Sequence, residues 1–256
     1  MSITGYRGLA ARLREAIERG EHLPGSTLPK QDELAERYGV NIKTVRQAIG
    51  LLEAEGLVTP IRRRGTVVRE RPPMRRLGIE RYSKQKWKYG DTVAFAADRE
   101  ASGRSWNRTD QTQTVALVEA DAEVSKAFGL EVGSPVYERA RTVRDAGQPT
   151  HTLTSYYLPQ HVAGTPLVDA APGPAGPGGG FAVLTLQGYE PDHISESLSA
   201  RMPTPDEIAT LDLPAGEPVM VLERRTYTAN DVLIEFARGV HAGSRFAWTY
   251  DFKLPE

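Results

Sequence analysis

The sequence contains no cysteine among its 256 residues. Disulfide bonds and thiolate metal sites are therefore excluded, and a reducing compartment is expected. The chain has no apolar run long enough to span a membrane, and its first residues lack the basic, apolar and small-residue regions of a signal peptide. We therefore expect a cytoplasmic protein with no membrane partner.

The patterns that mark common catalytic sites are missing as well. The chain has no HExxH, GxSxG or Gly-rich phosphate loop, and no nucleophile–base pair stands out. Its histidines show no metal-ligand spacing: His22, His151, His161, His193 and His241. We therefore expect no catalytic residue, no metal site and no cofactor.

The net charge of −1 hides an uneven distribution. Residues 1–78 hold 15 Lys+Arg and 9 Asp+Glu, a net of +6, and the remainder holds 17 and 24, a net of −7. A basic first third joined to an acidic remainder indicates that one part binds nucleic acid and the other has a different partner.

The stretch from Leu28 to Val68 has the order of a winged helix-turn-helix. We predict a supporting helix over 6–19, a short helix over 32–38, a turn at Gly39 and a second helix from Asn41, its N-cap, to about Glu55. That second helix has two faces at helical spacing. The apolar face carries Val45, Ala48, Ile49 and Leu52, and the opposite face carries Lys43, Arg46, Gln47 and Gly50.

A predicted β-hairpin follows, with the consecutive arginines Arg62, Arg63 and Arg64 at its tip. A basic turn is usually only solvated, but this one follows a helix with a basic outer face, so both can contact one duplex. Arginine can pair with guanine and the Gln amide with adenine. The residues predicted to contact DNA are Lys30, Asn41, Lys43, Thr44, Arg46, Gln47, Arg62, Arg63, Arg64, Gly65 and Thr66. Arg7, Arg12 and Arg14 are expected to be solvated instead.

The motif LP..DELA..YGV...TVR.AI..L...GL......RGT resembles the DNA-binding domain of the GntR family of bacterial repressors. It departs from the family pattern at Lys30-Gln31-Asp32 and at Asn41-Ile42. These departures predict an operator that differs from a simple family consensus. The resemblance implies a double-stranded DNA operator and a homodimer.

After residue 90 the pattern predicts an α+β domain with a largely antiparallel sheet. The expected strands are 92–100, 112–120, 135–144, 150–158, 193–200, 218–228, 233–241 and 244–252. The expected helices are 122–128, 181–188 and 206–211. Residues 70–90 are expected to be a linker, either a mobile hinge or an extension of the DNA footprint. The Pro/Gly-rich stretch 172–180 is expected to be a flexible loop, a plain surface insertion more than a mobile lid.

Several blocks in this half resemble the UTRA effector-binding domain of the HutC branch of the GntR family: VYERARTVRDAGQP, SYYLP, E.L.AR.PTPDE, LDLPAGEPV and LIEF followed by SRFAWTYDF. The resemblance implies a fold like chorismate lyase, an antiparallel sheet flanked by helices, with dimerisation through this sheet. It also implies that an anionic effector contacts Arg139, Arg141, Ser155, Tyr157 and Glu235, with His241 where some relatives have Tyr. The alternative for the arginine pair is exposed cross-strand pairing with neighbours such as Glu138, and Glu196 is expected to be structural.

We therefore expect two domains, residues 1–71 for DNA binding and 91–256 for effector binding and dimerisation, joined by the linker 72–90. The predicted function is a ligand-responsive transcriptional repressor that binds a palindromic operator as a homodimer and is released by a small anionic effector. The alternative is a small-molecule enzyme of chorismate lyase-like fold.

Overall fold

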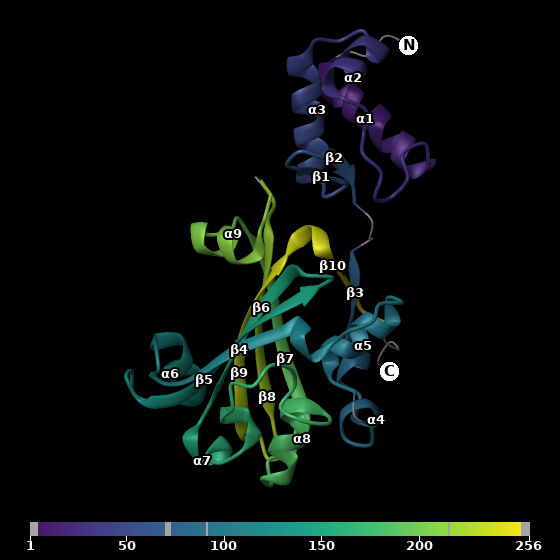
Figure 1. The fold of residues 1–256 in the computed structure, drawn as a ribbon. Helices are drawn as coiled ribbons and strands as arrows, with labels where there is room; N and C mark the ends of the chain where they lie inside the picture. The colour runs from purple at the N-terminus through teal and green to yellow at the C-terminus, as the bar shows by residue number, and fades with distance from the viewer. Residues whose placement is uncertain (1–4, 70–72, 91, 215, 252–256) are drawn as a thin grey trace, which may run out of the picture. The chain divides into compact units, whose positions relative to one another are not determined.

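The computed structural model describes residues 5–69, 73–90, 92–214 and 216–251, and it divides into two compact units (Figure 1). The first unit is Met1–Pro73 with Leu213–Pro218, and the second is Met74–Asp212 with Val219–Glu256. The expected domain boundary between residues 71 and 72, the start of the expected linker at 70 and the expected strand end at residue 252 lie outside the described residues. Among the described residues, no helix has both the length and the apolar character to cross a membrane.

The first unit is a winged helix-turn-helix. Its elements are α1 (Gly5–Glu18), α2 (Gln31–Tyr38), α3 (Ile42–Ala54), β1 (Val58–Ile61) and β2 (Gly65–Val68), which confirms the predicted helices and hairpin. Gly39 ends α2 with φ of 63°, a left-handed conformation that favours glycine. The helices and the hairpin share one apolar core, which includes Leu9, Leu13, Leu34, Val45, Ala48, Ile49, Leu52 and Val58.

The second unit is built on a six-stranded antiparallel sheet with the strand order β4-β5-β6-β9-β8-β7. The strands are β4 (Gln111–Glu119), β5 (Pro135–Asp145), β6 (Gln148–Tyr157), β7 (His193–Arg201), β8 (Val219–Tyr227) and β9 (Leu233–Ala242). They confirm the six strands predicted between residues 112 and 241. The tight turn from β5 to β6 has positive φ at Ala146 and Gly147, as two-residue hairpin loops require.

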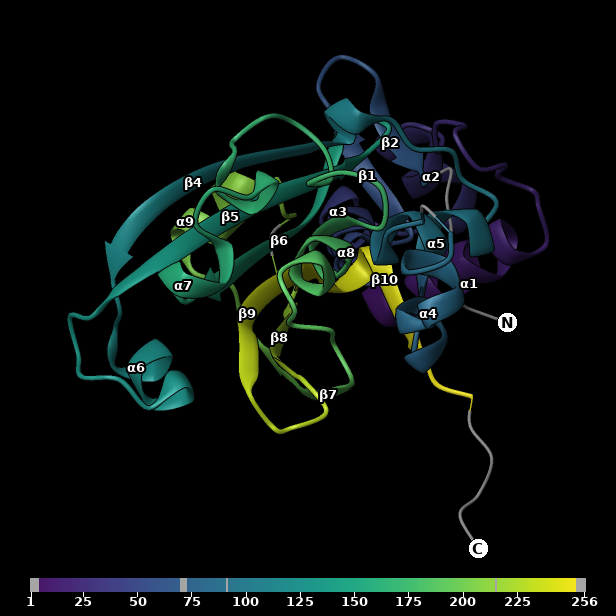
Figure 2. The same cartoon turned by 90° about the horizontal axis from the view of Figure 1, so that it is seen from below.

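Helices flank this sheet, as the chorismate lyase-like fold implied. They are α4 (Lys84–Trp87), α5 (Ala94–Ala101), α6 (Ala122–Phe128), α7 (Pro159–Val162), α8 (Gly179–Leu186) and α9 (Pro205–Leu211). Helices α4 and α8 lie side by side in both views, whereas α6 lies at the far end of the sheet (Figures 1 and 2).

The strand predicted over 92–100 is wrong, because α5 occupies this stretch. The β-branched pair Thr92-Val93 suggested a strand, but the alanine-rich sequence that follows has a strong helix propensity. Val93 is the N-cap residue of α5. The last predicted strand, 244–252, is shorter in the structure: β10 (Phe246–Thr249). It pairs in parallel with β3 (Met74–Leu77), outside the six-stranded sheet.

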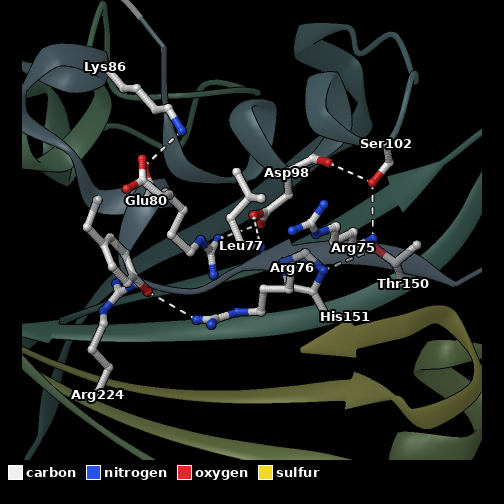
Figure 3. A network of polar contacts seen from close by, with 12 residues as sticks. Arg75, Arg76, Leu77, Glu80, Lys86, Asp98, Ser102, Thr150, His151 and Arg224 are labelled. Carbon is white, nitrogen blue, oxygen red and sulfur yellow. Dashed lines mark hydrogen bonds and ion pairs between the residues drawn. The ribbon is translucent and has the colours of Figure 1, made fainter. Parts of the chain in front are cut away.

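The stretch predicted as a linker contains β3, a 3₁₀ turn over Ile79–Tyr82 and α4. Its basic side chains suggested solvation, yet Arg76 is 1% exposed and Arg81 is 8% exposed. Arg76 lies 2.7 Å from Glu196 and Arg81 lies 3.0 Å from Asp98. Asp98 also accepts the backbone N–H of Leu77 (Figure 3). Carboxylates distant in the sequence neutralise these arginines and allow their burial.

The Pro/Gly-rich stretch 172–180 is not a plain surface insertion. The N–H of Gly173 donates to the Gln111 carbonyl at 2.9 Å, and the Gln111 amide donates to the Gly173 carbonyl at 2.9 Å. A Cβ at Gly178 would lie 2.1 Å from the Trp87 carbonyl oxygen, so only glycine fits this close approach. The stretch is thus bonded to β4 and packed against α4.

Candidate functional sites: a basic helix face and a buried cavity

The outer face of α3 carries the predicted DNA contacts. Lys43, Arg46 and Gln47 are exposed, whereas Val45 and Ala48 are fully buried. Arg46 Nε donates to Gln31 Oε1 at 3.0 Å. This bond from the start of α2, which we did not predict, orients the guanidinium and leaves its Nη groups for a base edge.

Two of the predicted DNA contacts, Asn41 and Lys30, do not lie on the outward face of α3. The Asn41 side chain accepts the N–H of Thr44 at 2.8 Å, which confirms its role as N-cap. Lys30 is exposed before α2, and its N–H donates to Glu33 Oε2 at 3.1 Å. Asn41 therefore has a structural role that exists without DNA.

The turn between β1 and β2 exposes Arg62, Arg63, Arg64 and Gly65, and Thr66 is partly buried at the start of β2. Arg64 donates from Nη2 to the Gly25 carbonyl at 2.8 Å. This bond draws the Arg64 guanidinium back to the loop before α2. Arg14, one of the α1 arginines predicted to be solvated, forms an ion pair of 2.6 Å with Glu55.

One face of the six-stranded sheet collects the predicted effector residues. Arg139 pairs in register with Ser155, and Ser155 pairs with Ala237 on β9. Because side chains alternate along a strand, Arg139, Arg141 and Ser155 point to the same face. This face forms the floor of a cavity of about 110 Å³, which Arg139, Arg141, Tyr157 and Glu235 line.

Glu235 is the centre of a buried hydrogen-bond network. Its Oε1 accepts from Ser155 Oγ at 2.5 Å and Tyr157 OH at 3.0 Å. Its Oε2 accepts from Arg224 Nη2 at 2.8 Å and Thr226 Oγ1 at 3.2 Å. Burial alone raises the pKa of Glu235, but the Arg224 and Arg141 guanidiniums lower it below its usual value overall. The carboxylate is therefore ionised, and its oxygens are occupied by the protein's own donors.

Arg139 is buried and Arg141 half-buried beside this network, and among the described residues neither forms an ion pair with a carboxylate. Arg139 Nη1 donates to the carbonyls of Leu167 and Asp169 at 3.0 and 2.7 Å. Arg141 donates from Nε to the Leu153 carbonyl at 3.1 Å and from Nη2 to Ser155 Oγ. Burial and the neighbouring Arg141 lower the pKa of Arg139 to about 10.

Arg139 thus keeps its charge at neutral pH. Both arginines donate to neutral acceptors, and the carboxylates of Asp169 and Glu235 act on Arg139 and Arg141 through their charge without an ion pair. The alternative of exposed pairing with Glu138 is wrong, because Arg139 is 2% exposed and Glu138 instead accepts from Tyr156 OH at 3.0 Å. A cavity floor with two cations that donate to neutral acceptors can hold an anion.

His241 lies opposite His151 in register, on the same face of the sheet, but it does not line the cavity. Its ring stacks on His151, with the ring centroids 4.6 Å apart and the planes 4° apart. His151 lines the cavity. Burial lowers the pKa of both rings well below the usual value, and the charges of Arg76 and Arg81 lower it further. The pair is therefore neutral.

Sequence reasoning missed several lining residues, notably Arg224, His151, Trp87 and Phe181. Arg224 shares one face of β8 with Leu222 and Thr226, and all three are buried, but only the spacing from Leu222 could have pointed to that face. Trp87 and Phe181 carried no such signal. Trp87 lies in the stretch predicted to be a linker, and Phe181 directly follows the stretch predicted to be a flexible loop. Glu196 was predicted to be structural, and it accepts from Arg76 and Tyr82.

Comparison with known proteins identifies both domains. The model of the gntR family of bacterial regulatory proteins matches residues 5–68, and the UTRA domain model matches residues 109–247. An uncharacterized HTH-type transcriptional regulator of Streptomyces coelicolor is 54% identical over 251 residues, 98% of this chain and 93% of the relative. The histidine utilization repressor of Pseudomonas putida is 25% identical over 248 residues, 94% of this chain and 88% of the relative.

A crystal structure of a GntR-family transcriptional regulator superposes with a TM-score of 0.60 and 27% identity, covering 98% of each chain. These relatives are transcriptional regulators, so the alternative of a small-molecule enzyme is excluded. The chain therefore belongs to the GntR family of transcriptional regulators, with the helix-turn-helix and UTRA domains of its HutC branch.

Proposed function

We propose that this regulator is a repressor that binds a palindromic operator as a homodimer and is released by a small anionic effector in the second unit. The observation that carries the effector part is the pair Arg139 and Arg141, which lines the cavity and donates hydrogen bonds to neutral acceptors. Two forked guanidiniums on one strand face suit a carboxylate or a phosphate. A relative named as a repressor supports the direction of control.

The dimer follows from the amount of sequence that one helix can read. The exposed face of α3 offers Lys43, Arg46 and Gln47 to the major groove, and one such helix reads only a few base pairs. A twofold pair of helices doubles the recognised sequence and raises specificity against the many competing genomic sites. The basic wing adds phosphate contacts beside each helix. The effector can act only through a difference in its affinity for the DNA-bound and released arrangements.

The test begins with the wild-type protein and fragmented genomic DNA. Selected fragments should share an inverted repeat, and sedimentation of the complex should give two chains per duplex. A panel of small acids is then screened for release of the selected fragment in fluorescence anisotropy.

The double variant Arg139→Gln/Arg141→Gln should bind the fragment with wild-type affinity but no longer respond to the releasing acid. Arg144→Gln is the matched control, because Arg144 is on the same strand and bonds to Thr112 at 3.0 Å, away from the cavity. A response retained in the double variant, or one chain per duplex, would contradict the proposal.

A further inference from the structure

The cavity above the sheet has two chemically different walls. Arg139 and Arg141 on β5 form the cationic wall, while Trp87, Phe95 and Phe181, from helices α4, α5 and α8, contribute aromatic rings to the lining. Arg224 lies 5.7 Å from the centroid of the Phe181 ring. Trp87 and Phe181 pack edge to face with their centroids 5.6 Å apart. Such an arrangement of rings presents an apolar surface to whatever lies between the walls.

The volume limits the ligand to a compact body. The cavity holds about 110 Å³, whereas an engineered apolar cavity of about 150 Å³ in another protein accommodates benzene. A body of about one ring is therefore the largest that the enclosed part accepts, with its acid group directed at the arginines.

The polar groups around the cavity are largely committed to one another. Glu235 accepts hydrogen bonds at both oxygens, and Tyr157 OH donates to it. Tyr82 OH donates to Glu196, and the Gln111 amide nitrogen donates to Gly173 and Gln113. A ligand with many hydroxyl groups would lose hydrogen bonds to water and regain few here, which is costly for each unpaired group.

A positive ligand is disfavoured by the same lining. Arg81, Arg139, Arg141 and Arg224 contribute four cations, and the carboxylate that faces them is Glu235. Arg81 and Arg224 form ion pairs with Asp98 and Glu235, so the lining cations that form no ion pair with a described residue are Arg139 and Arg141. The ligand must therefore carry negative charge at one end and little polarity elsewhere.

We propose that the effector is a small acid, carboxylate or phosphonate, whose body is a single ring or a similarly compact apolar group seated against Trp87, Phe95 and Phe181. This inference rests on the proposed effector function and specifies its ligand. It separates this site from one built for sugar phosphates or inorganic phosphate.

Isothermal titration of the full-length protein with matched acids tests the proposal. The pairs are benzoate with acetate and phenylphosphonate with methylphosphonate, and glucose 6-phosphate and inorganic phosphate complete the set. Each pair keeps the acid group and removes the ring, so the affinity ratio within a pair measures the apolar wall without any mutation. We expect the ring-bearing member to bind on the order of tenfold to a hundredfold more tightly.

Two variants assign the effect to the two walls. Phe181→Ala should reduce the ratio within each pair towards one, and Arg141→Gln should weaken both members alike. Tighter binding of glucose 6-phosphate or inorganic phosphate than of the aromatic acids overturns the ligand class and leaves the proposed function intact. Failure of every acid to bind, with the wild type and Arg141→Gln indistinguishable, removes the inference together with the anionic effector.

Discussion

Buried charges in the second unit are of two kinds. Arg76 and Arg224 each contact a carboxylate, at 2.7 and 2.8 Å. Arg139 and Arg141 contact neutral acceptors. Removing one partner of a buried ion pair leaves an uncompensated charge, whereas removing a buried cation without a carboxylate does not. A buried arginine can therefore be required for stability at one position, and reduce stability in favour of ligand binding at another.

Substitution at two positions should separate these cases. Arg224→Met leaves Glu235 buried without its guanidinium and should lower the free energy of unfolding by about 3–5 kcal/mol. Arg139→Met should cost much less, because two carbonyls lose a donor but a desolvated cation is also removed. Urea unfolding of both variants measures the difference. An Arg139→Met variant as unstable as Arg224→Met would show that Arg139 is a structural group.

The stacked pair His151 and His241 predicts a pH dependence of stability. Their pKa values are lowered in the folded protein, so below pH ~6.5 the unfolded chain binds protons that the folded chain does not. The free energy of unfolding should therefore be full above that pH and fall below it, by about 1.4 kcal/mol per pH unit for each histidine.

Urea unfolding between pH 7.5 and 5.5 measures the slope. His241→Phe should reduce it by about one histidine's share. Equal slopes in wild type and His241→Phe would mean that the pair is not neutral in the folded state.

At the level of elements, local sequence patterns predicted the helices and strands that interactions between neighbouring residues determine. The faces of α3 followed from helical spacing, and the six sheet strands followed from alternation and turn residues. The prediction of a linker over 72–90 was wrong because Glu196 and Asp98, which lie later in the sequence, neutralise Arg76 and Arg81. The parallel pairing of β3 with β10 is equally non-local. The effector arginines came from family resemblance, since alternation alone also allowed an exposed pair.

The exposed face of α3 should read bases through Arg46. Arg46→Ala should weaken operator binding by about 1–3 kcal/mol and relax the preference at one operator position. Its bond to Gln31 orients the guanidinium, so Gln31→Ala should produce a smaller loss at the same position. Binding to a library of single-base operator variants measures both effects, with the exposed Arg19→Ala as control. An unchanged preference in Arg46→Ala would exclude base contact by this residue.

The wing should contact phosphates through Arg62 and Arg63 more than through Arg64, which donates to the Gly25 carbonyl. Each phosphate contact contributes about 0.9 to the slope of log K against log salt concentration. Arg62→Ala/Arg63→Ala should flatten the slope by up to about two contacts, and Arg64→Ala by less. Anisotropy titrations over a salt series give these slopes. Equal flattening by Arg64→Ala alone would contradict this assignment.

For the whole molecule, the charge distribution and the proposed twofold symmetry act together. The net of +6 in residues 1–78 attracts DNA, and the net of −7 in the remainder opposes adventitious binding of the body. The symmetry makes affinity depend on the spacing of two half-sites along the duplex.

Changing that spacing tests the assembly as a unit. Inserting about five base pairs, half a helical turn, at the centre of the operator places the half-sites on opposite sides of the duplex and should reduce affinity to the nonspecific level. Inserting about ten base pairs restores the facing and is the control for the added length. Anisotropy with the three duplexes measures the effect. An affinity that neither insertion changes would contradict a homodimer that binds two half-sites at once.

The parallel pair of β3 and β10 joins the first strand of the second unit to residues 246–249, about 170 residues later. During synthesis, residues 5–68 emerge early and make mostly local contacts, so their helices can form while the ribosome is still translating the remainder. The strand that follows them must wait for its partner until residues 246–249 have been synthesised. A chain terminated before residue 246 would therefore carry the DNA-reading helices on a body whose first strand is unpaired and exposed to aggregation.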